Sequence, residues 1–216
     1  MNSRTKKLTM VAMVCAIAYA VMFVVRIKMF GFLTYDPKDV VITIAGFILG
    51  PFSAFVSSVI VGTIEMFTVS DTGVIGLIMN ILSTASFACI ASYIYKKKHT
   101  IVGAVIGLLV GSLVMTAIMI LWNYLLTPIY MGMPRQAVVD MILPILLPFN
   151  LLKCGINSAI TMLIYKPIVK ALRKTNLIEK SKENLTSKTS SRAIIIISLI
   201  LLATCVLFVL QLNGVI

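Results

Sequence analysis

Seven apolar stretches divide the chain, and their lengths restrict it to folds that lie within a membrane. They cover residues 8–25, 40–49, 52–67, 74–95, 101–126, 141–169 and 193–212. A helix needs about 20 apolar residues to cross a bilayer, where its backbone polar groups must be satisfied internally. Hydrophobic residues make up 60% of the 216 residues, too many for a soluble domain to bury. We therefore predict an all-α integral membrane protein whose short second span ends at Gly50 and Pro51.

The distribution of Lys and Arg predicts the orientation of these spans. With a cytoplasmic N-terminus, the inner side carries the basic residues of segments 4–7, 96–98 and 166–192. The outer side then carries Arg26, Lys28, Lys38 and Arg135. This is the bias of the positive-inside rule. We expect a multi-pass protein of the cell membrane with its N-terminus inside and, if the seventh span forms, its C-terminus outside. The net charge of +12 lies at helix ends, so we expect no nucleic-acid partner.

Several kinds of chemistry lack their sequence signals. The chain has no G-x-x-x-x-G-K-[ST] segment for ATP, and its single histidine, His99, follows three lysines at a helix end. The four cysteines stand alone in apolar spans, so we expect neither a metal site nor disulfides. An enzyme acting on lipid phosphates would need clustered carboxylates or histidines at one membrane face. A channel or secondary transporter is disfavoured by the lack of internal repeats.

Lys153 is the only cation well inside an apolar run. An ammonium group there costs about 2.5–3.5 kcal/mol unless it is compensated. Asn150 and Asn157 lie three residues before it and four after it, so all three can share one helix face. Such a face should meet a ligand, a water-filled cavity or another polar helix. The alternative is a structural partner, for which Glu65 is a candidate.

Other polar residues lie at similar depths in neighbouring spans. Asn80 and Asn123 are expected at the level of Asn150, with Lys153 slightly deeper. Amides both donate and accept hydrogen bonds, as a planar heterocycle with carbonyls and ring nitrogens requires. We expect an outward-facing cavity between the fourth, fifth and sixth spans.

The outer connecting segments supply further candidates. Asp36, before Pro37, can contact a ligand or cap the following helix. Gly73 and Gly76 can let a ligand approach the backbone, or can serve close helix packing.

These residues together resemble a known family. The resemblance is carried by Ala12, Ala16 and Ala20 at four-residue spacing, by the segment 33–40, by Gly50-Pro51, and by segment 149–153 after Asn123. They are similar to the substrate-binding S components of energy-coupling-factor (ECF) vitamin transporters, especially the riboflavin-specific ones. The resemblance covers roughly residues 5–172.

The resemblance implies a six-helix S-component core, residues 1–172, followed by a basic polar linker, 173–192, and a seventh transmembrane helix, 193–216. It implies capture of riboflavin or its phosphate FMN for ATP-driven import, with no other cofactor. The implied partners are an ECF transmembrane coupling subunit and two cytoplasmic ATPases. A different vitamin or heterocycle is the alternative ligand.

The resemblance also implies residue roles. The implied ligand contacts are Thr34, Tyr35, Asp36, Gly73, Gly76, Asn80, Asn123, Asn150 and Lys153. The implied surface for the coupling subunit is Ala12, Ala16 and Ala20. S components are thought to topple in the membrane, which carries the site inward.

The seventh span departs from the six-helix pattern. It is uniformly apolar and is expected to face lipid. The linker of about 20 residues before it would let it stay upright while the core rotates.

Overall fold

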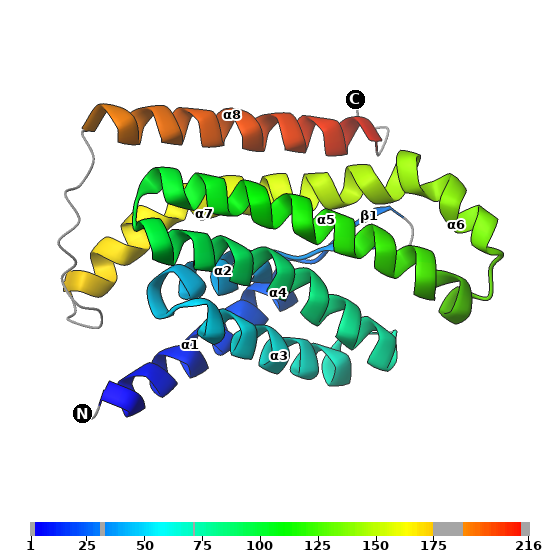
Figure 1. Cartoon of the computed structure of the whole chain (residues 1–216), viewed down its shortest axis with the longest axis horizontal. Helices are drawn as coiled ribbons and strands as arrows, with labels where there is room; N and C mark the ends of the chain where they lie inside the picture. Colours follow the sequence, from blue (N-terminus) through cyan, green and yellow to red (C-terminus); the bar gives the residue numbers. More distant parts are fainter. Residues whose placement is uncertain (1–2, 31–32, 71, 175–187, 213–216) are drawn as a thin grey trace.

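The computed structural model describes residues 3–30, 33–70, 72–174 and 188–212, and it is a bundle of helices with one small hairpin (Figure 1). The elements in chain order are α1 (Ser3–Val24), β1 (Ile27–Phe30), β2 (Leu33–Tyr35), α2 (Lys38–Leu49), α3 (Pro51–Thr68), α4 (Gly73–Lys98), α5 (Ile101–Met131), α6 (Arg135–Met141), the π-helical turn η1 (Ile142–Leu146), α7 (Leu147–Lys174) and α8 (Lys188–Leu212). Each predicted apolar stretch contains a helix, which confirms the all-α class.

Helix length separates the full spans from the shorter ones. Within the described part of the chain, five helical segments are long and apolar enough to cross a membrane: Arg4–Val24, Pro51–Thr68, Gly73–Lys98, Ile101–Met131 and Arg135–Val169. Helix α2 has only 12 residues. The apolar segment Ile195–Gln211 of α8 is also shorter than these spans.

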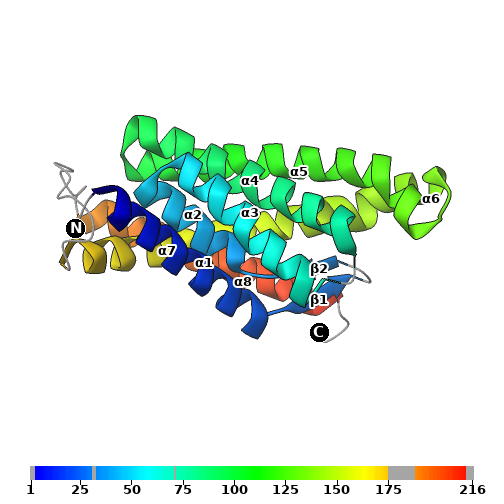
Figure 2. The same cartoon turned by 90° about the horizontal axis from the view of Figure 1, so that it is seen from below.

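The helix termini and the connecting segments gather at two opposite ends of the bundle. The start of α1, the α4–α5 connection and the last turns of α7 lie at one end, and the hairpin, the start of α4 and α6 lie at the other (Figures 1 and 2). We call the second the hairpin end. The basic helix ends therefore lie together, opposite the hairpin.

The hairpin was not predicted from the sequence. Strands β1 and β2 pair antiparallel, with Ile27 opposite Tyr35 and Lys28 opposite Thr34. Strands this short hold too few residues for their alternation to stand out beside apolar helices. Along β2 the buried Leu33 and Tyr35 alternate with the half-buried Thr34. Thr34 and Tyr35 therefore face opposite sides of the hairpin.

Glycines bring α4 and α5 close together. A Cβ atom added to Gly107 would lie 2.6 Å from the carbonyl oxygen of Ala91, and one added to Gly111 would lie 2.7 Å from that of Phe87. Small residues at such a contact let helix backbones approach and pack tightly within a membrane. This packing fixes the position of α4 relative to α5. Asn80 lies in the first half of α4 and Asn123 in the second half of α5, so both lie toward the hairpin end.

Aromatic side chains fill the bundle at the end opposite the hairpin. The hydroxyl groups of Tyr95 on α4 and Tyr165 on α7 form a hydrogen bond. The Phe47 ring of α2 lies 4.6 Å from the Tyr95 ring, measured between centroids. These three residues are buried in one apolar cluster, which leaves the hairpin end as the more polar half of the core.

Helices α6, η1 and α7 form one continuous helical segment that contains a π-helical turn. The turn spans Ile142–Leu146 and includes Pro144. Proline lacks a backbone N–H and so breaks the α-helical bonding pattern. Wide turns of this kind often occur near functional sites. The turn ends four residues before Asn150.

Helix α8 packs along α7, and one of its faces is buried. Ser198 and Cys205 are 5% and 9% exposed, and Leu202 and Val209 pack into the same side of the core. These residues follow a 4-3-4 spacing, which places them on one face. The expectation that this helix faces lipid therefore does not hold for its buried face, while Ile197 and Leu207 on the same helix are 63% and 54% exposed. The predicted linker falls mostly on residues 175–187, outside the described residues.

Candidate ligand pocket

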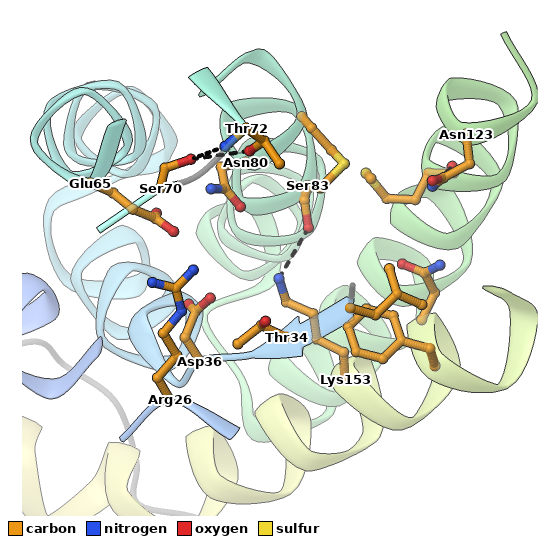
Figure 3. Close-up of a pocket in the computed structure, with 15 residues that line it drawn as sticks. Arg26, Thr34, Asp36, Glu65, Ser70, Thr72, Asn80, Ser83, Asn123 and Lys153 are labelled. Carbon is orange, nitrogen blue, oxygen red and sulfur yellow. Dashed lines mark hydrogen bonds between the residues drawn. The ribbon is translucent and has the colours of Figure 1, made fainter. Parts of the chain in front are cut away.

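A cavity of about 340 Å³ lies between the hairpin and helices α3, α4, α5 and α7 (Figure 3). Its lining combines charged, amide, hydroxyl and apolar side chains: Arg26, Leu33, Thr34, Asp36, Glu65, Ser70, Thr72, Met79, Asn80, Ser83, Met119, Asn123, Phe149, Asn150 and Lys153. Pockets for small molecules typically have volumes of about 300–1,000 Å³ and a few placed polar groups. The cavity fits a small organic ligand.

Six of the nine predicted ligand contacts line this cavity. They come from the hairpin and its exit, α4, α5 and α7: Thr34, Asp36, Asn80, Asn123, Asn150 and Lys153. The structure therefore brings together residues that are more than 100 positions apart in the sequence.

The other three predicted contacts do not line the cavity. Tyr35 points away from it and donates a hydrogen bond of 3.0 Å to Oδ1 of Asn157. Gly73 opens α4 with a φ of +56°, a conformation that glycine adopts without strain. A Cβ atom on Gly76 would collide with the side chain of Thr72. Both glycines thus have conformational or packing reasons to be glycine.

Lys153 has a structural partner, which is Asp39 and not Glu65. Its Nζ lies 3.2 Å from Oδ2 of Asp39, and it donates to Oγ of Ser83 at 3.4 Å. An ammonium group has three N–H donors, and these contacts within the described residues use two of them, which leaves one that can face a ligand in the cavity. Lys153 is therefore both an ion-pair partner and a lining residue.

Asp39 is fully buried at the centre of a polar network. Thr84 donates to its Oδ1 at 2.6 Å, and Asn157 donates to its Oδ2 at 3.3 Å. A buried ion pair is tolerated when such additional hydrogen bonds satisfy its remaining lone pairs. Burial raises the pKa of the Tyr35 hydroxyl, and the Asp39 carboxylate raises it further. Both effects favour the protonated hydroxyl, which is the form that donates to Asn157.

The two buried asparagines of the pocket are held by their own helices. Nδ2 of Asn123 donates to the Met119 carbonyl at 2.7 Å, and Nδ2 of Asn150 donates to the Leu146 carbonyl at 2.7 Å. Thr127 also donates to Oδ1 of Asn123 at 2.9 Å. Each amide has a second N–H that these bonds do not use. The amides are thus oriented in advance and keep capacity for a ligand.

A second charged cluster lies at the hairpin side of the cavity. Lys38, 1% exposed, forms an ion pair with Glu65 and lies 3.5 Å from Oδ1 of Asp36. Nearby, Nη1 of Arg26 donates to the Val69 carbonyl at 2.9 Å, which ties β1 to the end of α3. Lys38 and Arg26 looked like orientation signals in the sequence, yet one is buried and the other lines the cavity.

Sequence reasoning also missed lining residues with weaker signals. Ser83 lies three residues after Asn80, on the same helix face, so helical spacing could have found it. Ser70 and Thr72 lie just before Gly73, which was itself a predicted ligand contact. Met119 is an apolar residue in an apolar run and carries no distinguishing signal. Phe149 belongs to the segment 149–153 that carries the family resemblance, but it was not assigned a role.

Comparison with known proteins identifies the family. Residues 6–165 match the family described as "ECF transporter, substrate-specific component". The chain belongs to this family. A solved S component of a bacterial ECF transporter has the same fold, with a TM-score of 0.67 and 27% sequence identity, and the match covers 79% of this chain and 99% of that one.

Several curated relatives are similar over most of their length. The riboflavin transporter RibU of Staphylococcus aureus (strain TCH60) is 28% identical over 180 residues, which is 79% of this chain and 94% of that protein. The riboflavin transporter FmnP of Bacillus subtilis (strain 168) is 26% identical over 189 residues, or 81% and 99%. As an S component, the chain is a transporter subunit and not an enzyme.

Proposed function

We propose that this S component binds riboflavin in the cavity and delivers it inward with an ECF energising module. The observation that carries the proposal is the juxtaposition of Asn123, Asn150 and Lys153 in one cavity. Their amide and ammonium groups present donors and acceptors to a planar heterocycle, and Phe149 and Met119 add apolar surface beside them. The names of the curated relatives support riboflavin over other vitamins.

The visible absorption spectrum of the purified protein tests this proposal. A co-purified flavin would give a yellow protein, and the apoprotein should bind riboflavin tightly enough to quench flavin fluorescence in a titration. Flat titrations with riboflavin and FMN, beside tight binding of another vitamin, would contradict the ligand while leaving the family intact.

We also propose partners and an orientation for the chain. The exposure of Ala12, Ala16 and Ala20 on α1 supports a docking surface for an ECF transmembrane coupling subunit, which works with two cytoplasmic ATPases. The basic helix ends opposite the hairpin support a cytoplasmic N-terminus in the cell membrane and a cavity that faces outward. In this proposal residues 1–172 form the binding core, 173–192 a cytoplasmic linker, and 193–216 an accessory helix whose C-terminus lies outside.

A further inference from the structure

A second cavity lies between α5, α7 and α8, and we call it the α8 groove. It has a volume of about 80 Å³ and is lined mainly by apolar side chains, among them Ala104 of α5, Met162 of α7 and Ile195 of α8. Within the described part of the chain, Lys166 of α7 is the one charged residue in its lining. Ile195 is 42% exposed, so the groove opens at the surface of the bundle. Pockets for drug-sized molecules have volumes of about 300–1,000 Å³, so this groove fits a narrower apolar chain.

Helix α8 and a proline in α7 shape the groove. Ile195 lies beyond residues 6–165, the part of the chain that matches the family. Pro167, inside α7, has no N–H to donate to the carbonyl of Leu163, and both residues line the groove. Figure 1 shows the last turns of α7 turning away from the start of α8. The groove therefore depends on the helix that this chain carries in addition to the matched core.

The groove lies at the basic end of the bundle, opposite the hairpin. Basic residues occupy the first turns of α1 and α8 and the last turns of α4 and α7. The carboxylates of the described residues lie at the hairpin end: Asp36, Asp39, Glu65 and Asp140. An apolar groove in these surroundings is complementary to a ligand that is anionic at one end and apolar at the other.

Lys166 joins a positive charge to the apolar walls of the groove. It is half-buried, and its neighbours Met162 and Tyr165 are 9% and 7% exposed. A lysine in such surroundings lays its apolar stem along the wall and keeps its ammonium group at the polar surface. A peptide in the groove would place backbone N–H and C=O groups against apolar walls, where they lose their hydrogen bonds. A phospholipid instead offers an acyl chain to the walls and a phosphate group to the ammonium, and basic pockets between transmembrane helices bind anionic headgroups.

We propose that the α8 groove binds an anionic phospholipid, with part of an acyl chain between α5, α7 and α8 and the phosphate group at Lys166. With the orientation proposed above, this lipid belongs to the inner leaflet. It links α8 to the core at the end opposite the hairpin, and it requires no vitamin in the larger cavity.

Native mass spectrometry of the full-length protein in detergent measures this binding. The probes are phosphatidylglycerol and phosphatidylcholine with the same acyl chains, so that they differ in headgroup charge. The unmodified protein should bind phosphatidylglycerol about fivefold more tightly, the effect of about one cation near an anionic headgroup. Lys166→Gln should remove this preference, and Lys166→Arg should keep it because the charge remains. Ile195→Trp should weaken the binding of both lipids alike, since the ring fills the groove.

Two variants are matched controls. Lys97→Gln makes the same change at the same end of the bundle, on α4, where Nζ of Lys97 lies 4.6 Å from the centroid of the Tyr93 ring. Ile197→Trp places the same ring on α8 at a residue that is 63% exposed. Neither Lys97 nor Ile197 lines the groove, so both variants should bind the two lipids as the unmodified protein does.

Each contrary result overturns the inference in a different way. Equal binding of the two lipids by the unmodified protein would remove the role of the phosphate group. Equal losses in Lys97→Gln and Lys166→Gln would assign the preference to the basic end as a whole and not to this groove. Unchanged binding in Ile195→Trp would place the lipid elsewhere on the protein. If Lys166→Gln did not fold, Lys166→Arg and Ile195→Trp would still decide the matter. The experiment contains no flavin, so its failure and that of the proposed function are separate results.

Discussion

We propose that Lys153 has two tasks, one in the structure of the core and one in ligand binding. Its ion pair with Asp39 compensates the buried ammonium, and its position in the cavity wall offers a donor to a ligand. Removing one partner of a buried pair leaves an uncompensated charge, at a cost of about 3–5 kcal/mol. Losing a donor to the ligand costs about 1–3 kcal/mol of binding. The two tasks should therefore respond differently to substitution.

Lys153→Ala is expected to lower both thermal stability and flavin affinity. Adding Asp39→Asn should recover much of the stability, because no buried charge is left unpaired, but should not recover affinity. Thermal unfolding in detergent and flavin titration measure the two effects. Unchanged flavin affinity in the single variant, with stability lost, would assign Lys153 to structure alone.

The sequence predicted the conspicuous polar residues of the site, but it did not predict which residues form ion pairs or hydrogen bonds with them. Asn123, Asn150 and Lys153 are conspicuous because they interrupt apolar runs. Asp39 was passed over as the partner of Lys153, because the pairing of α2 with α7 is a tertiary contact that helical periodicity does not encode. Tyr35, a predicted ligand contact, lies outside the cavity lining for a related reason. Its side chain direction follows from a two-stranded hairpin too short to recognise.

At the level of elements, the apolar runs located the helices well. The observed helix ends differ from the predicted ones by a few residues, because hydropathy does not mark where backbone hydrogen bonding stops. The π-helical turn and the buried face of α8 were not predicted. Both depend on how α7 meets its neighbours: Pro144 widens the helix before the site, and Gly155 makes room for Cys205.

The contact between Gly155 and Cys205 can report whether α8 moves with the core. A Cβ atom added to Gly155 would lie 3.0 Å from Sγ of Cys205, about the separation that a disulfide requires. Gly155→Cys should therefore form a disulfide with Cys205 under mild oxidation, detectable by mass spectrometry. Gly155→Cys combined with Cys205→Ser is the matched control and should not cross-link between α7 and α8.

The buried face of α8 favours a helix that travels with α7. We expect the cross-linked protein to bind flavin normally and to support uptake at the rate of the reduced protein. Normal binding with abolished uptake would show instead that α8 separates from α7 during transport, as the prediction of an upright seventh helix requires.

For the whole molecule, the proposed transport cycle needs one surface for ligand and a separate one for the energising subunit. The cavity lies at the hairpin end, among α3, α4, α5 and α7. The alanine face of α1 lines no part of it, and Met13 and Ile17 beside that face are each 50% exposed. Binding and coupling should therefore be separable by substitution on α1.

Ala16→Trp should spare flavin binding and abolish uptake in cells that contain the coupling subunit and ATPases. The bulky ring would hold a partner helix away from the small-residue face, where small side chains let helix backbones approach closely and pack. Flavin titration of the purified variant and uptake of labelled riboflavin provide the two measurements. Leu113→Trp places the same ring on α5 at a residue that is 67% exposed, and it should change neither. If Ala16→Trp removed flavin binding as well, the stripe would be needed for the core of the S component rather than for its partner.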